Sequence, residues 1–121
     1  MDDEETIRSV ASVLLERLGF TVVTVADGMT AVAVYSDAIK NGDPFKLVIM
    51  DLTVPGGMGG SEAMDELLKI DPRVRAIVSS GYSSDPVLSN YRANGFRGMV
   101  PKPYKLTDLA RTIRSVLEEK A

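Results

Sequence analysis

Residues 47–55 read Leu-Val-Ile-Met-Asp-Leu-Thr-Val-Pro, and four glycines follow within residues 56–60. A short aliphatic run that a Pro/Gly turn ends is typical of a strand buried on both faces of a parallel sheet. Asp51 then stands at the carboxyl end of that strand, where open α/β sheets bind their ligands. We therefore expect the carboxylate of Asp51 to have a function.

Helical and strand patterns alternate on both sides of this stretch. Apolar residues at helical spacing predict helices over residues 4–18, 31–38, 61–70, 85–94 and 106–120. Short apolar runs predict strands over residues 20–25, 45–50, 75–79 and 97–100. We expect Gly19 to end the first helix and Ser61 to cap the third. This alternation predicts a single α/β domain over residues 1–121, with a parallel sheet covered on both faces.

The composition excludes several classes of protein. With 121 residues, 45% hydrophobic and 26% charged, the chain is globular and large enough for one core. Its net charge of −3 and its scattered 14 Lys and Arg residues argue against a nucleic-acid surface. No apolar run approaches the roughly 20 residues of a membrane span, and the acidic start is unlike a signal peptide. We expect a cytoplasmic protein that binds neither nucleic acid nor membrane.

The chain contains no cysteine and no histidine, so any metal site must use oxygen ligands such as those of Mg²⁺, Mn²⁺ or Ca²⁺. The acidic residues 2–5 directly precede a predicted helix, and Lys102 follows the last predicted strand. In a parallel sheet these groups, Asp51 and the hydroxyl of Ser79 or Ser80 would meet at one rim. Such a set can bind a hard divalent cation and hold a phosphoryl group.

Five separated motifs resemble one family in order and spacing. They are Asp2-Asp3-Glu4-Glu5, Gly19–Val22 with Ala26-Asp27-Gly28, Val48–Pro55, Ser79-Ser80-Gly81-Tyr82 and Lys102-Pro103-Tyr104. Together they are similar to the receiver domain of bacterial two-component response regulators over the whole chain. The Gly-Gly-Met-Gly-Gly stretch looks most like receivers of hybrid sensor histidine kinases. The resemblance implies the flavodoxin-like, doubly wound parallel sheet of that family.

The resemblance also implies a role for Asp51 and a metal site beside it. Asp51 would be the phosphoacceptor, which attacks the phosphorus of a phosphohistidine on a partner histidine kinase or phosphotransfer protein. Asp3, with help from Asp2, would hold Mg²⁺ (or Mn²⁺) together with Asp51 and the backbone carbonyl of Thr53. The chain would then be no enzyme, apart from accepting its own phosphoryl group and slowly losing it.

Two further residues take their expected roles from the same resemblance. Ser80 falls at the family's switch hydroxyl, which moves to bind the new phosphoryl group. Lys102 falls at the lysine that pairs with this group, before a Lys102–Pro103 bond that is expected to be cis. A carboxylate that attacks an anionic phosphoryl group needs such positive charge nearby to offset the repulsion.

Each of these features has a simpler interpretation when it is taken alone. The acidic residues 2–5 could complement a helix dipole, and Asp51 could be a turn residue. Ser79 and Ser80 are common turn formers, and a lysine before proline is often a solvated loop residue. The glycines within 56–60 match no P-loop and are interpreted as a flexible turn.

One departure from the family concerns its first strand, which lies at the sheet's centre and directly precedes the acidic pair. This chain begins at Met1, so we expect that strand to be missing and the domain to be N-terminally truncated relative to the family. Such a loss would cost more than the typical stability of about 5–15 kcal/mol. A fragment of a longer kinase, a rearranged fold or a homodimer would reconcile this, and we favour the homodimer.

The missing strand also leaves other functions open. The main alternative is a phosphorylation-impaired, dimeric interaction module, because the acidic pair would lie at a frayed end. A Mg²⁺-dependent phosphatase on a related scaffold is a third possibility. It is disfavoured because Thr53 stands where such an enzyme would need a second catalytic acid.

Overall fold

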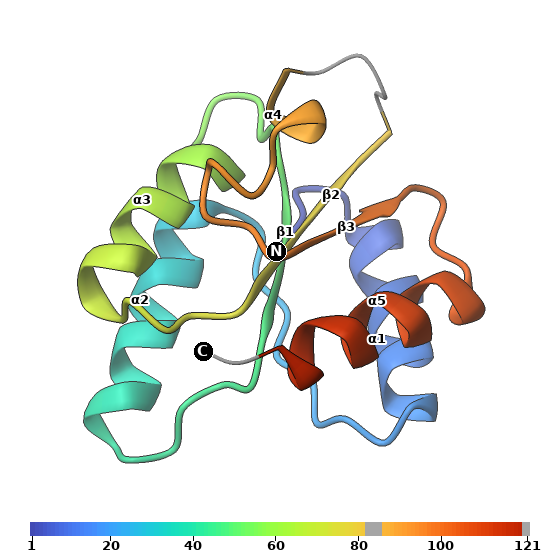
Figure 1. Ribbon diagram of the computed structural model, residues 1–121, viewed down its shortest axis with the longest axis horizontal. Helices are drawn as coiled ribbons and strands as arrows, with labels where there is room; N and C mark the ends of the chain where they lie inside the picture. Colours follow the sequence, from blue (N-terminus) through green and yellow to red (C-terminus); the bar gives the residue numbers. More distant parts are fainter. Residues whose placement is uncertain (82–85, 120–121) are drawn as a thin grey trace.

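The computed structural model describes residues 1–81 and 86–119, with only the backbone described for Ser80, Pro86 and Val87. Figure 1 shows helices on both sides of a small sheet. The elements are α1 (Glu5–Arg17), α2 (Gly28–Lys40), β1 (Val48–Asp51), α3 (Gly60–Ile70), β2 (Ala76–Ser80), α4 (Pro86–Ser89), β3 (Gly98–Pro101) and α5 (Leu106–Glu118). No helix in these described ranges is both long enough and apolar enough to cross a membrane.

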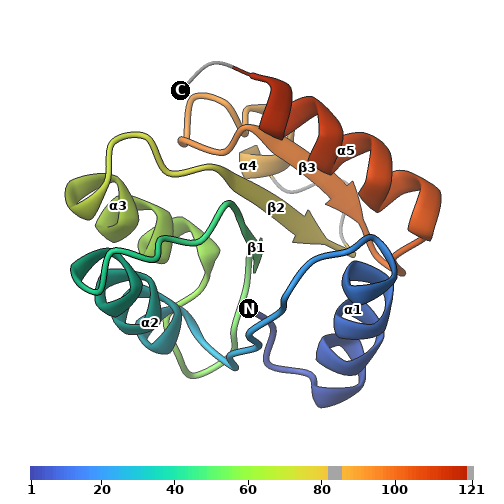
Figure 2. The ribbon, with the colours of Figure 1, turned by 90° about the horizontal axis from the view of Figure 1, so that it is seen from below.

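The sheet is parallel and has the strand order β1-β2-β3 (Figure 2). Asp51 lies opposite Ser79, and Ser79 lies opposite Val100. Since parallel strands end at the same edge of a sheet, the ends of β1, β2 and β3 meet there. Asp51 closes β1, and Lys102 comes directly after β3.

Two hydrophobic clusters cover the two faces of this sheet. The first joins the sheet to α3, with Met64 and Leu67 fully buried, and to Tyr35 of α2. The second joins Ile77 and Val100 of the sheet to Leu109, Ile113 and Val116 of α5, with partly buried residues of α1 against it. Figure 1 accordingly shows α2 and α3 on one side of the sheet and α1 and α5 on the other. The predicted α/β architecture, consistent with a flavodoxin-like fold, is confirmed.

The prediction of a strand over residues 20–25 is wrong. Residues 20–25 run in an extended path but are assigned no strand among the described residues. Their carbonyl at Val25 accepts one hydrogen bond, from the backbone N–H of Asp2 (3.1 Å). A strand needs a repeated ladder of such bonds, and the β-prone sequence alone does not supply a partner.

Two predictions about helices also need correction. The helix expected over residues 85–94 is only α4, Pro86–Ser89, because residues 90–95 form turns that end with a positive φ at Gly95. Its first predicted residue lies outside the described part of the chain. Ser61 does not cap α3, because Gly60 already begins the helix and Gly59 occupies the cap position without a side-chain hydrogen bond.

The glycines before α3 are not a flexible turn throughout. A Cβ atom on Gly59 would lie 2.5 Å from the carbonyl oxygen of Leu52, and one on Gly60 would lie 2.6 Å from that of Asp51. The N–H of Gly60 donates to the Leu52 carbonyl (3.0 Å). These two positions need glycine because α3 packs its backbone directly against the end of β1.

The first two residues lie between β1 and the extended segment 20–25. The nitrogen of Met1 donates to the carbonyl of Ile49 (2.7 Å), and the N–H of Asp51 donates to the carbonyl of Met1 (2.9 Å). These two bonds follow the pattern of a parallel ladder beside β1. They bring Asp2 next to the end of β1. The helix that follows, α1, contains no buried residue.

Candidate functional site

The candidate site lies at the carboxyl edge of the sheet and is built from three segments of the chain. Asp51 ends β1 with 8% of its surface exposed, and Asp2 is 3% exposed beside it. Lys102 reaches them from the loop after β3, whose Lys102–Pro103 peptide bond is cis as expected. Sequence positions about 50 residues apart thus converge on one cluster.

The ammonium group of Lys102 bridges two buried carboxylates. Its Nζ lies 2.6 Å from Asp2 Oδ2 and 3.1 Å from Asp51 Oδ1, and the lysine side chain is only 12% exposed. Further hydrogen bonds orient Asp2: its Oδ1 accepts from the N–H of Glu4 (2.9 Å), and its backbone carbonyl accepts from Arg8 Nη1 (2.8 Å). Asp2 is therefore held through both its side chain and its backbone.

The carboxylates fit a divalent cation. One oxygen from each of Asp2, Asp3 and Asp51 lies within 4.8 Å of the others, with Asp3 exposed. The buried Oδ2 of Asp2 has its ion pair with Lys102 but no hydrogen bond of suitable geometry. Three carboxylates and one ammonium group leave two negative charges, which a Mg²⁺ or Mn²⁺ ion would neutralise with its preferred oxygen ligands.

The pKa values of the paired groups respond to burial and to each other. Burial raises the pKa of Asp51, the charges of Asp2 and Asp3 act in the same direction, and contact with Lys102 opposes them without cancelling them. Burial alone would lower the pKa of Lys102, but the contacts with Asp2 and Asp51 outweigh it and raise that pKa. At neutral pH Lys102 is a charged partner for the carboxylates.

The sequence did not predict a pair of hydroxyl groups that lies beside this cluster. Ser79 Oγ and the hydroxyl of Tyr104 lie 2.7 Å apart, and Ser79 is fully buried. Burial raises the pKa of Tyr104 above its ordinary value. The position of Tyr104 two residues after Lys102 was visible in the sequence, but nothing there named Ser79 as its partner.

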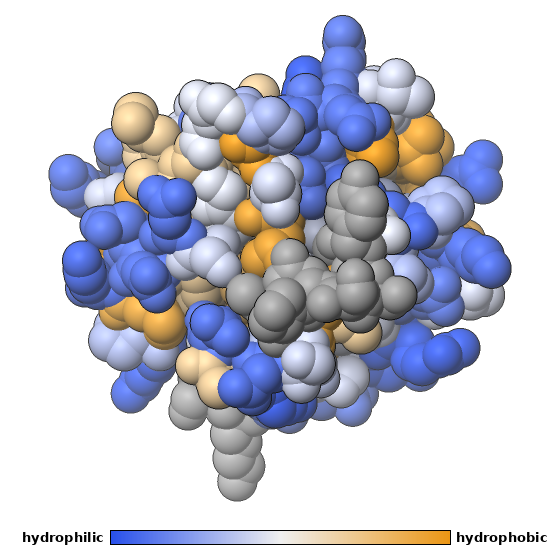
Figure 3. Space-filling model, turned by 90° about the horizontal axis from the view of Figure 1, so that it is seen from above, coloured by the Kyte–Doolittle hydropathy of each residue, from blue (hydrophilic) through white to orange (hydrophobic). Residues whose placement is uncertain are grey.

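Two of the predicted site residues are less fully placed. Ser80 ends β2 at the correct edge, but its side chain lies outside what the structure describes. Thr53 is exposed two residues after Asp51, and the role of its carbonyl stays a prediction. Figure 3 views this edge from above: a small hydrophobic area next to the grey residues is bordered by residues of intermediate hydropathy and by hydrophilic ones.

A comparison of the sequence with known families identifies the family. The sequence profile of the response regulator receiver domain matches residues 1–114. The chain belongs to this family. Among curated relatives, the receiver domain is 31% identical over 98% of its length to the sensor kinase CckA of Brucella abortus. It is 26% identical over 96% of its length to the chemotaxis protein CheY of Thermotoga maritima.

These relatives differ in how much of them the receiver domain spans. It covers 12% of CckA but 92% of the Thermotoga maritima CheY, and half or less of several others. The domain therefore occurs both as a small part of large signalling proteins and as nearly a whole protein.

Solved structures show the same fold. The receiver domain of the sensor histidine kinase PA1611 from Pseudomonas aeruginosa PAO1, with a magnesium ion coordinated in its active-site cleft, has a TM-score of 0.84 at 23% identity. The match covers 98% of this chain and 94% of that one. A two-component response regulator of the LuxR family from Aurantimonas has a TM-score of 0.82 at 28% identity, over 97% and 81% of the two chains.

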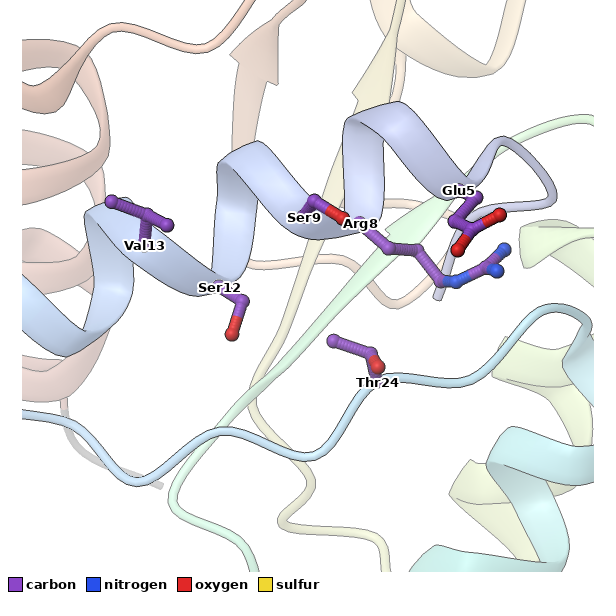
Figure 4. A pocket seen from close by; sticks show the side chains of 6 residues that line it. All are labelled: Glu5, Arg8, Ser9, Ser12, Val13 and Thr24. Carbon is purple, nitrogen blue, oxygen red and sulfur yellow. The ribbon is translucent and has the colours of Figure 1, made fainter.

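A shallow hollow of about 390 Å³ lies between α1 and the extended segment 20–25 (Figure 4). It is lined by Glu5, Arg8, Ser9, Ser12, Val13 and Thr24. Arg8 connects it to the receiver site, because the same side chain donates to the backbone carbonyl of Asp2. The hollow holds no carboxylate of the acidic cluster and adds no group to the chemistry there.

Proposed function

We propose that the domain accepts a phosphoryl group on Asp51 in two-component signalling. The observation that carries this proposal is the convergence of Asp51 with Asp2, Asp3 and Lys102 at the carboxyl edge of the sheet. A buried carboxylate beside an ammonium group and two more carboxylates has little structural value, because burying such charges costs free energy. The arrangement suits a reaction in which charge is added to Asp51.

In the proposed reaction an Oδ atom of Asp51 attacks the phosphorus of a phosphohistidine. The new bond joins this oxygen to phosphorus, the P–N bond breaks, and its electron pair stays on the imidazole nitrogen, which takes a proton from solvent. A later attack by water on the phosphorus releases inorganic phosphate and restores the carboxylate. The chain turns over no other substrate and in that sense is not an enzyme.

Lys102 would contribute charge at two stages of this reaction. Before transfer it neutralises Asp51 and Asp2 through the two contacts described above. After transfer its ammonium group is within reach of the phosphoryl oxygens, since Asp51 carries them. Preorganised charge of this kind stabilises phosphoryl transfer because little covalent chemistry is left for the protein to do.

Asp2, Asp3 and Asp51 would hold a Mg²⁺ or Mn²⁺ ion, with the carbonyl of Thr53 as a further ligand. When bound, the ion neutralises charge on the phosphoryl oxygens and aligns them with the carboxylate. The hydrogen bond from the backbone N–H of Glu4 engages one carboxylate oxygen of Asp2, and the other, Oδ2, lies in the cluster beside Lys102. We propose Ser80 as the hydroxyl that binds the transferred group.

The phosphoryl donor would be a histidine kinase or a histidine phosphotransfer protein, in the cytoplasm. Similarity to a sensor kinase and to CheY supports this class of partner without naming one. The response would pass onward by protein contact.

The proposal is tested by locating the phosphoryl group. After treatment with acetyl phosphate and Mg²⁺, borohydride reduction of an aspartyl phosphate gives homoserine, which peptide mass spectrometry places in the sequence. Homoserine at position 51 is expected, and Asp43→Asn is a control that removes an exposed aspartate elsewhere. Modification at another aspartate, or its persistence in Asp51→Asn, would refute Asp51 as the acceptor.

A second candidate is a dimeric interaction module with impaired phosphorylation. Two observations favour it: β1 is an outer strand of the three-stranded sheet, and α1 has no buried residue. A second copy that adds a strand beside β1, in line with the two bonds that Met1 already makes there, would cover both features. Sedimentation velocity at micromolar concentration tests this, and a folded monomer throughout the range would exclude the dimer.

A further inference from the structure

The loop that carries Lys102 has few fixed points. Among the described residues, no backbone hydrogen bond to another backbone group holds residues 102–104. The ion pairs of Lys102 hold its ammonium group, but they must rearrange when Asp51 becomes phosphorylated. A second anchor is needed for the ammonium group to stay at the site during that change.

Tyr104 supplies such an anchor. Its hydroxyl lies 2.7 Å from Ser79 Oγ, and its ring packs against the cluster that contains Ile77 and Leu109. Ser79 is fully buried in β2, directly opposite Asp51, and its carbonyl accepts a hydrogen bond from the N–H of Leu52 (3.2 Å). The hydroxyl bond therefore ties the lysine's loop to the strand position beside the phosphoacceptor.

We infer that Tyr104 and Ser79 are positioning residues for Lys102. Their hydrogen bond holds the loop so that the ammonium group stays beside Asp51 before and after phosphoryl transfer. Neither hydroxyl oxygen belongs to a reacting group, so the bond persists while the ion pairs change partner. This role rests on the proposed function of Asp51, and it goes beyond that function by naming what keeps Lys102 in place.

A purely structural role makes a different prediction. Removing one partner of a buried hydrogen bond leaves the other unsatisfied, whereas replacing both with apolar groups of similar shape is nearly neutral for stability. The pair Tyr104→Phe with Ser79→Ala deletes both hydroxyls and keeps the ring. If the bond only stabilised the fold, this double variant would regain the wild-type rate as well as its stability.

The first test measures the rate of phosphorylation by acetyl phosphate at saturating Mg²⁺. We expect Tyr104→Phe, Ser79→Ala and the double variant each to react roughly threefold to tenfold more slowly, with the double variant near wild-type stability. Tyr35→Phe is the matched control, because it deletes an equivalent bond, Tyr35 to Asp71 (2.7 Å), remote from the site. A double variant that reacts at the wild-type rate would overturn the inference.

The second test asks whether Tyr104 acts through Lys102. In a Lys102→Gln background, adding Tyr104→Phe should change the rate no further, because the group being positioned is absent. An equal slowing in both backgrounds would contradict a positioning role.

A third readout needs no phosphorylation. The side-chain ¹⁵NH₃⁺ signal of Lys102 should be visible by NMR in the wild type and in Tyr35→Phe, and broadened in Tyr104→Phe and Ser79→Ala. Unchanged signals would overturn the inference. If the four proteins show these signals but the wild type takes up no phosphoryl group, the proposed function is refuted, whereas the inference that Tyr104 and Ser79 position Lys102 still holds.

Discussion

Helices α1 and α5 have the same length, but α5 has the more sharply separated apolar and polar faces, and the two helices are buried to different degrees. In α5, Leu109 and Val116 are fully buried, whereas no residue of α1 is buried, and Val10 and Val13 are 45% and 55% exposed. The two helices also face different surfaces: α5 covers paired strands, and α1 lies beside the extended segment 20–25. An apolar stripe specifies a helix, but burial depends on the surface that faces it.

The candidate site combines residues from both regions, the paired strands and the chain beside α1. Asp51 ends a paired strand and Lys102 directly follows one, whereas Asp2 and Asp3 lie in the chain just before α1. We therefore expect changes near α1 to disturb the positions of Asp2 and Asp3 more than that of Asp51. The following predictions test this contrast, from the largest expected effect to the smallest.

The first prediction compares equivalent leucines in the two helices. Leu109→Ala should lower the free energy of unfolding by about 3 kcal/mol, because it leaves a cavity in a packed core. Leu14→Ala should cost only about 1 kcal/mol, because Leu14 is partly exposed and loses less buried area. Urea denaturation followed by circular dichroism measures both values. Equal costs would mean that α1 is as well packed as α5.

The second prediction concerns the positive charge of Lys102, which contacts both Asp2 and Asp51. Lys102→Gln should slow phosphorylation by acetyl phosphate by roughly 100-fold, the typical loss when one preorganised donor is removed. Lys105→Gln, an exposed lysine in the same loop, is the control and should react at the wild-type rate. Similar rates for the two variants would remove Lys102 from the proposed mechanism.

The third prediction separates metal binding from folding. Asp3→Asn should weaken Mg²⁺ binding by roughly tenfold, the lower end of losses seen when groups around a metal are removed. Its stability should be unchanged because Asp3 is exposed. Calorimetric titration with MgCl₂ measures the affinity, with Glu4→Gln as a control for loss of one acidic charge. An unchanged affinity would exclude Asp3 as a ligand.

The fourth prediction uses the raised pKa of Asp51. In the pH window between its unfolded and folded pKa values the folded state binds more protons, so stability falls as pH rises through that window. Asp51→Asn removes this loss and should raise stability at neutral pH by about 1 kcal/mol, as expected for relief of an active-site charge. The gain should disappear in acid, where Asp51 is protonated in both states. Thermal unfolding at several pH values checks the sign, and a destabilised variant at neutral pH would contradict it.

The sequence predicted the parts of the fold that depend on local pattern. The buried strand ending at Asp51 and the helices around residues 28–40 and 106–118 follow directly from apolar spacing and turn residues. Residues 20–25 show the limit, because they have strand-forming side chains but lack the hydrogen-bonded neighbour that makes a strand. The prediction that Ser61 caps α3 was wrong for a related reason. The cap position is Gly59, where the nearby backbone of Leu52 requires glycine, and the general preference for serine at helix caps does not reveal this contact.

The site was predictable where one edge of a parallel sheet brings motifs together. This reasoning, with the resemblance, placed Asp2, Asp3, Asp51 and Lys102 near one another before any distances were known. It did not yield the bond between Ser79 and Tyr104, because that bond depends on the course of the loop after β3. The metal ligands and the switch hydroxyl of Ser80 stay predictions.

The central claim is that Asp51 accepts a phosphoryl group in a metal-dependent reaction, and intact-mass spectrometry tests it most directly. Wild type and Asp51→Asn are treated with acetyl phosphate, with and without Mg²⁺, after circular dichroism has shown that both are folded. We predict a single phosphoryl adduct that appears only on the wild type and only with Mg²⁺. A folded wild type without the adduct, or an adduct on Asp51→Asn, would contradict the account.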